Sequence, residues 1–203
     1  MFSQNNEEEI ILAEFARLGV QTGRFLEIGA WDGKCFSNTY RLAELGWKGV
    51  CVEPSPTVFP SLVKNHANNP LISLVNAAVS PHQAKLVEWF DSGGDAISTT
   101  SSAHKEKWEK GCKVKFTHFW IFTMPLAELF DNFGFDFDFI NIDVESTNLE
   151  LFRALPWAAL KQTKLICVEH DSYQQEMSLL AGQHGFFPTH LNGENLILTR
   201  QSL

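Results

Sequence analysis

The sequence predicts an α/β fold, a doubly wound parallel sheet that closes with an antiparallel hairpin. Two observations predict it, together with one general rule of chain connection. Short apolar runs alternate with amphipathic stretches along most of the chain, which is the pattern of a parallel sheet covered by helices on both faces. Right-handed crossovers make such a sheet doubly wound. Near the C-terminus, Asn192-Gly193 separates two apolar runs and is a strong hairpin signal.

Hydrophobic spacing and helix-ending residues place the elements in order. The first predicted helix covers residues 7–19, because it has glutamates in its first turn and Gly19 at its end. Further helices are expected at residues 34–46, 56–68, 125–134, 147–155 and 173–185. Strands are expected at residues 24–29, 48–54, 71–80, 137–143 and 163–170, followed by two strands within residues 186–200.

The middle of the chain departs from this alternation. Residues 84–90 and 113–124 are apolar enough to favour strands. Residues 91–112 between them are rich in Gly, Ser and Thr and are expected to form a mobile loop, the candidate lid. With no internal repeat and no linker, residues 1–203 are expected to form a single domain, with an N-terminal helix within residues 1–22.

Composition and charge narrow the possible partners. Hydrophobic residues make up 44% of the chain and charged residues 20%, as in a soluble globular protein. The net charge of −8 makes nucleic acid an unlikely partner, because a duplex-binding protein normally carries a basic face. The N-terminus lacks the layout of a signal peptide and no apolar run could span a membrane, so a cytoplasmic location is expected.

The four cysteines are far apart in the sequence and form no Cys-x-x-Cys pair. A disulfide framework or a zinc site is therefore not expected. The oligomeric state is left open.

Acidic residues mark the ends of four of the five main predicted strands. Glu27 lies near the end of the first strand, Glu53 ends the second, Asp143 ends the fourth, and Glu169 with His170 ends the fifth. Ligands of open α/β sheets bind beyond the carboxyl ends of the strands, so we expect the functional site at this edge.

The glycine turn after the first strand excludes one common ligand. A dinucleotide-binding Gly-x-Gly-x-x-Gly motif starting at Gly29 needs glycines at positions 31 and 34, which are Trp31 and Lys34. The second glycine lets the backbone approach a pyrophosphate, and Trp31 would obstruct that approach. A ligand with an adenosine but no phosphates is easier to accommodate, and S-adenosylmethionine (SAM) is such a ligand.

Several segments, in order, resemble one known family. Residues 25–56, "FLEIGAWDGKCFSNTYRLAELGWKGVCVEPSP", are similar to the opening of the FkbM-type family of SAM-dependent methyltransferases. Residues 124–145, "MPLAELFDNFGFDFDFINIDVE", resemble the family's helix and following strand, and residues 166–170, "ICVEH", resemble its next strand. With the C-terminal hairpin, the resemblance covers about residues 24–200.

The resemblance implies a class I methyltransferase fold, which is a Rossmann-like, seven-stranded, mostly parallel sheet with an antiparallel last strand. It also implies O-methylation, often of sugar or natural-product hydroxyls. The family usually continues its Asp-Val-Glu with Gly, a small residue and Glu, whereas this chain has Ser146, Thr147 and Asn148. This departure leaves the choice of substrate open.

The predicted cofactor site combines the glycine turn with two later strand ends. Glu53 is expected to accept hydrogen bonds from both ribose hydroxyls, and Asn76 with Ala77 to lie beside the adenine. Trp31 and Asp32 are expected at the methionine end, where Asp32 could meet the ammonium group. The complete predicted cofactor-binding set is Glu27, Gly29, Ala30, Trp31, Asp32, Gly33, Glu53, Pro54, Asn76, Ala77 and Asp143.

The predicted catalytic cluster is Asp143, Glu145, Glu169 and His170. Asp143 and Glu169 should end neighbouring strands, which lie about 4.8 Å apart, and two carboxylates that close either hold a proton or share a cation. In one version, His170 or Glu169 removes the proton of an acceptor hydroxyl. In the other, Asp143 and Glu169 hold Mg²⁺ and so lower the pKa of the hydroxyl; the metal-free version is favoured.

Three functions remain at this point. The first is SAM-dependent O-methylation of a saccharide or another small hydroxylated acceptor. The second is a SAM-binding interaction module with little catalysis, and the third is 2′-hydroxyl methylation of RNA.

Overall fold

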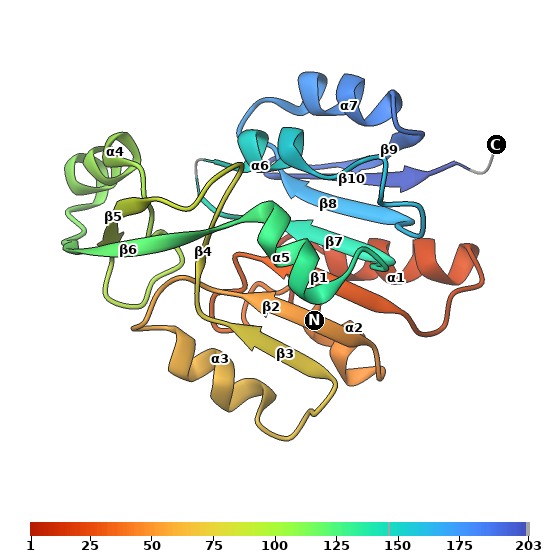
Figure 1. Cartoon of the computed structure of the whole chain (residues 1–203), viewed down its shortest axis with the longest axis horizontal. Helices are drawn as coiled ribbons and strands as arrows, with labels where there is room; N and C mark the ends of the chain where they lie inside the picture. Colours follow the sequence, from red (N-terminus) through yellow and green to blue (C-terminus); the bar gives the residue numbers. More distant parts are fainter. Residues whose placement is uncertain (146, 202–203) are drawn as a thin grey trace.

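The computed structural model describes residues 1–145 and 147–201. Its central sheet contains β1 (Arg24–Ile28), β2 (Lys48–Val52), β3 (Ile72–Val75), β7 (Phe139–Ile142), β8 (Leu165–Glu169), β9 (Phe186–Leu191) and β10 (Asn195–Arg200). These strands lie in the order β3-β2-β1-β7-β8-β10-β9 (Figure 1). Their pairings are parallel except those that β10 makes with β8 and β9. The predicted seven-stranded sheet with an antiparallel last strand is therefore confirmed.

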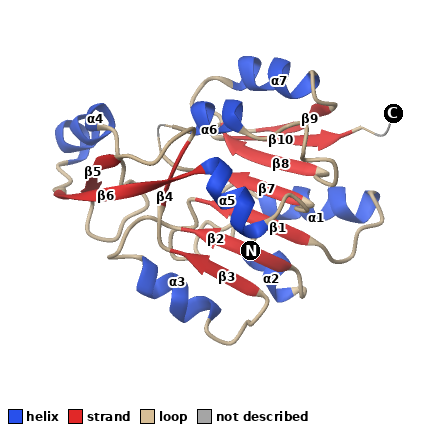
Figure 2. Ribbon diagram, viewed as in Figure 1, coloured by secondary structure: helices blue, strands red, loops and turns tan. Residues whose placement is uncertain are grey.

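Helices cover both faces of this sheet (Figure 2). They are α1 (Glu7–Arg17), α2 (Tyr40–Glu44), α3 (Phe59–His66), α5 (Leu126–Phe133), α6 (Asn148–Ala154) and α7 (Gln174–Gly182). One core contains apolar residues of α1, α2 and α3, and the other contains those of α5, α6 and α7. Successive residues of a strand contribute their side chains to opposite cores, since Phe25 belongs to the first core and Leu26 to the second. This arrangement confirms the doubly wound fold.

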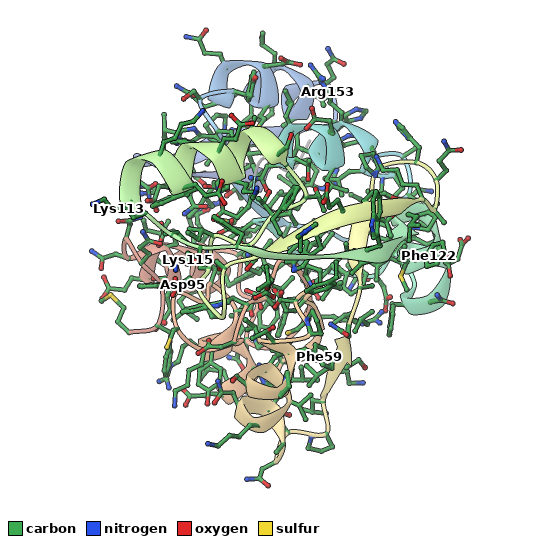
Figure 3. All side chains as sticks on the ribbon, turned by 90° about the vertical axis from the view of Figure 1, so that its left-hand side faces the viewer. Phe59, Asp95, Lys113, Lys115, Phe122 and Arg153 are labelled. Carbon is green, nitrogen blue, oxygen red and sulfur yellow. The ribbon has the colours of Figure 1, made fainter. Side chains whose placement is uncertain are left out.

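A second sheet projects beyond the carboxyl edge of the first. It comprises β4 (Ala78–Ser80), β5 (Leu86–Asp91) and β6 (Thr117–Pro125) in the order β4-β6-β5, and α4 (Ser102–Cys112) packs beside it. Figure 3 faces this side of the molecule and shows β6 crossing it. Phe122 lies near one end of the strand, and Lys115 lies just before its first residue.

The structure corrects the expected loop over residues 91–112, because its second half is α4. The Ser101 side chain accepts a hydrogen bond from the backbone N–H of His104 at 3.2 Å, which is a standard N-cap. Lys113 then ends the helix in a left-handed conformation, so β6 begins at residue 117 rather than 113.

The helix predicted over residues 34–46 is also largely wrong, because only Tyr40–Glu44 is helical. The preceding residues are held in an irregular path, in which the hydroxyl of Thr39 donates to the Glu27 carboxylate at 2.7 Å. Phe36 has a positive φ of 56°, which a helix does not allow.

The strand predicted over residues 71–80 divides into β3 and β4, which belong to different sheets. Asn76 stands at the break, where its amide donates to the carbonyl oxygens of Glu53 and Pro54.

Across the described residues, we find no helix with the length and apolar character that crossing a membrane requires.

Candidate functional site

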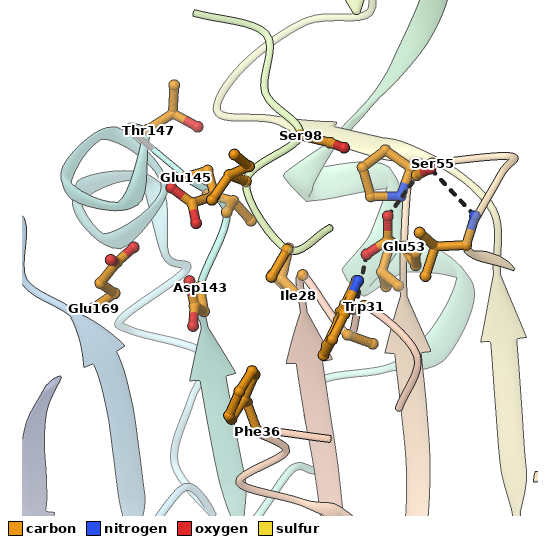
Figure 4. Close-up of a pocket in the computed structure, with 18 of the residues that line it drawn as sticks. Ile28, Trp31, Phe36, Glu53, Ser55, Ser98, Asp143, Glu145, Thr147 and Glu169 are labelled. Atoms are coloured by element: carbon orange, nitrogen blue, oxygen red, sulfur yellow. Dashed lines mark hydrogen bonds between the residues drawn. The ribbon is translucent and has the colours of Figure 1, made fainter. Parts of the chain in front are cut away.

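A cavity of about 450 Å³ lies beyond the carboxyl ends of β1, β2, β7 and β8 (Figure 4). Residues of the 95–100 loop and of α4 form its opposite wall. The predicted site residues that line it are Glu27, Gly29, Ala30, Trp31, Glu53, Pro54, Ala77, Asp143, Glu145 and Glu169. The structure thus brings together residues from four strand ends that are far apart in the sequence.

Gly29 allows the turn after β1 to pass close to β7. Its φ is +90°, and a Cβ atom at this position would lie 1.6 Å from the carbonyl oxygen of Asp143. The backbone N–H groups of Gly29 and Ala30 both donate to the carbonyl of Val52. Only glycine satisfies this geometry, so the turn and the end of β7 form one continuous cavity wall.

Trp31 lies along the cavity wall and reaches toward the loop that covers it. Its indole N–H donates to the carbonyl of Gly94 at 3.0 Å. Its ring stacks on Phe36, with centroids 5.7 Å apart and an interplanar angle of 10°. Trp31 has a φ of +47°, a conformation that non-glycine residues rarely adopt and that is enriched at ligand sites.

Glu53 is buried at the end of β2, with 6% of its surface exposed. Its two carboxylate oxygens accept hydrogen bonds from the backbone N–H groups of Trp31 at 2.8 Å and Ser55 at 2.7 Å. Each oxygen keeps a further lone pair for a ligand hydroxyl. Burial, with a smaller contribution from the nearby Asp91, raises the pKa of Glu53 to about 7.

Four of the predicted residues do not line the cavity. The carboxylate of Asp32 accepts the backbone N–H groups of Lys34 and Cys35, so it stabilises the turn. A Cβ atom on Gly33 would lie 2.3 Å from Leu62, so this glycine allows close packing on α3. The remaining two are Asn76, whose amide bonds are given above, and His170.

His170 is bonded within the turn after β8. Its Nδ1 accepts the backbone N–H of Ser172 at 3.0 Å, and its Nε2 lies 3.2 Å from the carbonyl oxygen of Asn192. Together these bonds leave neither ring nitrogen directed at the cavity. The predicted role of His170 as a base is therefore not supported by its position.

The remaining predicted acidic residues form a partly buried cluster at the ends of β7 and β8. Asp143 and Glu169 directly follow the paired residues Ile142 and Val168, so their carboxyl groups lie at adjacent strand ends and affect each other's pKa. Burial is the largest cause of raised pKa values throughout the cluster, and neighbouring carboxylates add to it. The pKa of Asp143 rises to about 7, that of Glu145 to about 8 and that of Glu169 to about 9.

Sequence reasoning missed four polar residues at this cluster. Asn148 donates to Glu169 and Asp171, and Thr99 donates to the backbone carbonyl of Glu145 at 3.2 Å. The Nε2 atom of His104 lies 3.3 Å from the Glu145 carboxylate. Asp171 could have been found, because it directly follows a strand end. The other three come from helices and a loop whose position only the folded chain defines.

Within residues 1–145 and 147–201, no three His, Cys, Asp or Glu side chains are arranged to hold a metal ion. Asp143 and Glu169 supply carboxylate oxygens of the kind Mg²⁺ prefers. The Mg²⁺ site through these two residues stays the less favoured of the two predicted versions.

Solved structures with a similar fold include methyltransferases. The precorrin-6y C5,15-methyltransferase of Geobacter metallireducens has a TM-score of 0.54 at 12% identity, over 95% of this chain and 88% of that chain. The ribosomal protein L11 methylase of Lactobacillus delbrueckii subsp. bulgaricus has a TM-score of 0.50 at 12% identity, over 98% and 81% of the two chains. At such identities the likeness concerns the fold.

The family is shown by the sequence itself. The model of the methyltransferase FkbM domain family matches residues 27–191, so the chain belongs to this family and is a SAM-dependent methyltransferase. No curated protein matches the sequence. The resemblance found in the glycine turn and the later strands is therefore confirmed. Ser146, the first of the three residues that depart from the family pattern, lies outside the described residues.

Proposed function

We propose that this methyltransferase transfers the methyl group to a hydroxyl of a saccharide or another small, neutral, hydroxylated acceptor. The observation that carries the proposal is the Asp143–Glu169 pair, whose carboxyl groups end two adjacent strands in the cavity wall. An alcohol does not ionise near neutral pH, so its methylation needs a group that takes its proton. A carboxylate with a pKa raised toward neutrality suits that task.

The residues at the other end of the cavity fit SAM. Both Glu53 oxygens have lone pairs left for the ribose hydroxyls, and Gly29 keeps the turn free of a side chain where the ligand would approach. Ala77 and Pro54 supply small lining surfaces beside β2 and β3. The cavity volume also lies within the usual range of ligand pockets, about 300–1,000 Å³. Bound SAM would supply an activated methyl group, and the chain would supply position and a proton acceptor.

Within the pair, we assign the role of base to Asp143. Asp143 ends β7, which pairs with β1 and so lies beside the glycine turn, whereas Glu169 ends β8, one strand further from that turn. Glu169 would hold the proton that the two neighbouring carboxyl groups share. The acceptor hydroxyl proton would pass to the Asp143 carboxylate as the new C–O bond forms and the bond between the methyl group and the sulfur of SAM breaks, with the neutral thioether as the leaving group. Glu145, at the same strand end, borders the space for the acceptor (Figure 4).

The charge of the cavity supports a neutral acceptor over RNA. Eight carboxylate residues line it, against a single lysine, Lys107, and a single histidine, His104. Phosphate-bearing ligands are bound through cationic side chains and backbone N–H groups, and this wall would repel them. An RNA 2′-hydroxyl methyltransferase is therefore the less favoured alternative.

We also propose that the segment of residues 91–112 acts as a lid. Residues 95–98 and α4 contribute side chains to the cavity, and the lid contacts both ends of it through Trp31 and Glu145. Such a cover would exclude water from the reacting groups.

Transfer of a radiolabelled methyl group from SAM to a panel of saccharides, polyols and RNA tests the function. We expect label in at least one neutral hydroxylated acceptor, and a large loss of rate in Asp143→Asn. Label in RNA alone would overturn the acceptor class. SAM binding without transfer to any acceptor would instead favour the interaction module.

A further inference from the structure

Asn148, the first residue of α6, lies between the carboxyl groups of the cluster and is completely buried. Its side-chain oxygen accepts the backbone N–H of Val144 at 2.9 Å. Its amide nitrogen donates to the carboxylates of Glu169 at 2.7 Å and Asp171 at 3.0 Å. The side chain therefore bonds the backbone on one side and two acidic groups on the other.

The oxygen and the nitrogen of this amide have different roles. The bond to Val144 fixes the loop between β7 and α6, which is a structural task. The two N–H donors lie between groups that would otherwise repel each other, because Asp171 contributes to the raised pKa of Glu169. A neutral side chain with two donors can keep both carboxyl groups in place without adding charge.

We propose that Asn148 is a positioning residue for methyl transfer. One of its amide hydrogens bonds the Glu169 carboxyl and the other bonds Asp171, and together they hold Glu169 beside Asp143. Asn148 does not itself line the cavity, so it acts through Glu169. The inference rests on the proposed function in one respect, namely that the Asp143–Glu169 pair takes the proton of the acceptor hydroxyl.

A matched pair of substitutions separates the two tasks. Asn148→Asp keeps an oxygen for the Val144 N–H but removes both donors and adds a charge. Asn148→Ala removes the Val144 bond as well. Glu150→Gln, on the exposed side of the same helix, is the control. All variants are measured for thermal unfolding, for SAM affinity by calorimetry, and for methyl transfer to the acceptor that the panel identifies.

For Asn148→Asp we expect SAM affinity close to that of the original protein and a kcat about tenfold to a hundredfold lower, as for a slightly misplaced catalytic group. Asn148→Ala should lower the unfolding temperature further than Asn148→Asp does. A wild-type kcat in Asn148→Asp would overturn the proposal. So would a parallel loss of SAM affinity and kcat, because that result indicates a merely structural role.

Exchange of the two side chains separates the lost donor from the added charge. In Asn148→Asp/Asp171→Asn the net charge of the pair is that of the original protein, and asparagine adopts the φ of +46° at position 171 readily. Since residue 148 still has no donor for Glu169, we expect kcat to stay within about threefold of that of Asn148→Asp. A kcat equal to that of the original protein would show that the added charge caused the loss, and would overturn the donor role.

A spectroscopic readout keeps this test independent of the acceptor. In protein labelled with ¹³C at the side-chain carboxyl carbons, the Glu169 resonance should shift in Asn148→Asp and stay unchanged in Glu150→Gln. If no hydroxylated acceptor is found, the proposed function fails, yet a shifted Glu169 resonance still supports the positioning role. If hydroxyl transfer is found but neither kcat nor this resonance responds, only the positioning role fails.

Discussion

Glu53 illustrates how one residue can be prepared for a ligand by its own chain. Both of its oxygens are already aligned by backbone N–H groups, from the glycine turn on one side and from Ser55 on the other. A ligand that binds here meets an acceptor whose orientation is fixed in advance. Such preorganisation lowers the entropy lost on binding.

Replacement of Glu53 by Gln tests this role. Glutamine keeps the size of the side chain, but it loses the charge and turns an N–H₂ group toward a backbone donor. Hydrogen bonds to charged groups are worth about 1.5–3 kcal/mol. We therefore expect the Kd for SAM to rise about tenfold to a hundredfold, measured by calorimetry. Glu44→Gln, exposed on α2, should bind as before; unchanged SAM affinity in Glu53→Gln would refute the assignment.

Glu27 predicts a pH dependence of stability. Burial raises its pKa to about 7, despite a hydrogen bond from Thr39, whereas an unfolded glutamate titrates at about 4.3. Between these values the folded protein holds the extra proton, so the contribution is complete below the unfolded pKa and is lost as the pH rises through 7. The unfolding temperature should therefore fall between about pH 5 and 7, and fall less steeply in Glu27→Gln. Equal slopes in both proteins would contradict the prediction.

At the scale of the element, the sequence best predicted the strands whose position depends on burial of apolar side chains. The five main parallel strands of the central sheet are fully or largely apolar, and each was located, with a correct position in the βα alternation. Their ends carry Glu53, Asp143 and Glu169, so these residues were predicted to meet in one site, and they line one cavity. The bounds of elements that depend on long-range polar bonds were not predictable from the sequence. The short helix α2 is an example, because Thr39 just before it donates to Glu27 on β1. Asn148 was recognised only as a departure from a family pattern, since its partners lie 21 and 23 residues away.

The loop over the cavity gives a prediction at this scale. Trp31→Phe keeps an aromatic ring that can stack on Phe36 but removes the indole donor to Gly94. We expect faster amide hydrogen exchange over residues 93–100, with exchange in β7 unchanged. Exchange over residues 93–100 should slow when SAM is added to the original protein. If Trp31→Phe leaves exchange in this loop unaltered, the indole bond does not hold the lid.

For the whole molecule, the central feature is that two hydrophobic cores share one sheet. Trp47 is buried in the core beneath α1, and Trp157 packs against the core on the opposite face. β10 connects the two because it lies between β8 and β9, and its consecutive residues Ile197 and Leu198 enter different cores. The last strand of the chain is thus required by both layers.

This arrangement predicts that residues 1–203 unfold as a single domain. Ile197→Ala and Leu198→Ala should each lower the free energy of unfolding by about 2–5 kcal/mol, as buried large-to-small substitutions do. Although the two residues face opposite cores, both variants should shift one common transition in urea, followed by tryptophan fluorescence and by far-UV circular dichroism. Leu191→Ala, half exposed on β9, should change stability by no more than about 0.5 kcal/mol. Separate transitions for the two probes, or a shift of one probe only, would show that the layers unfold independently.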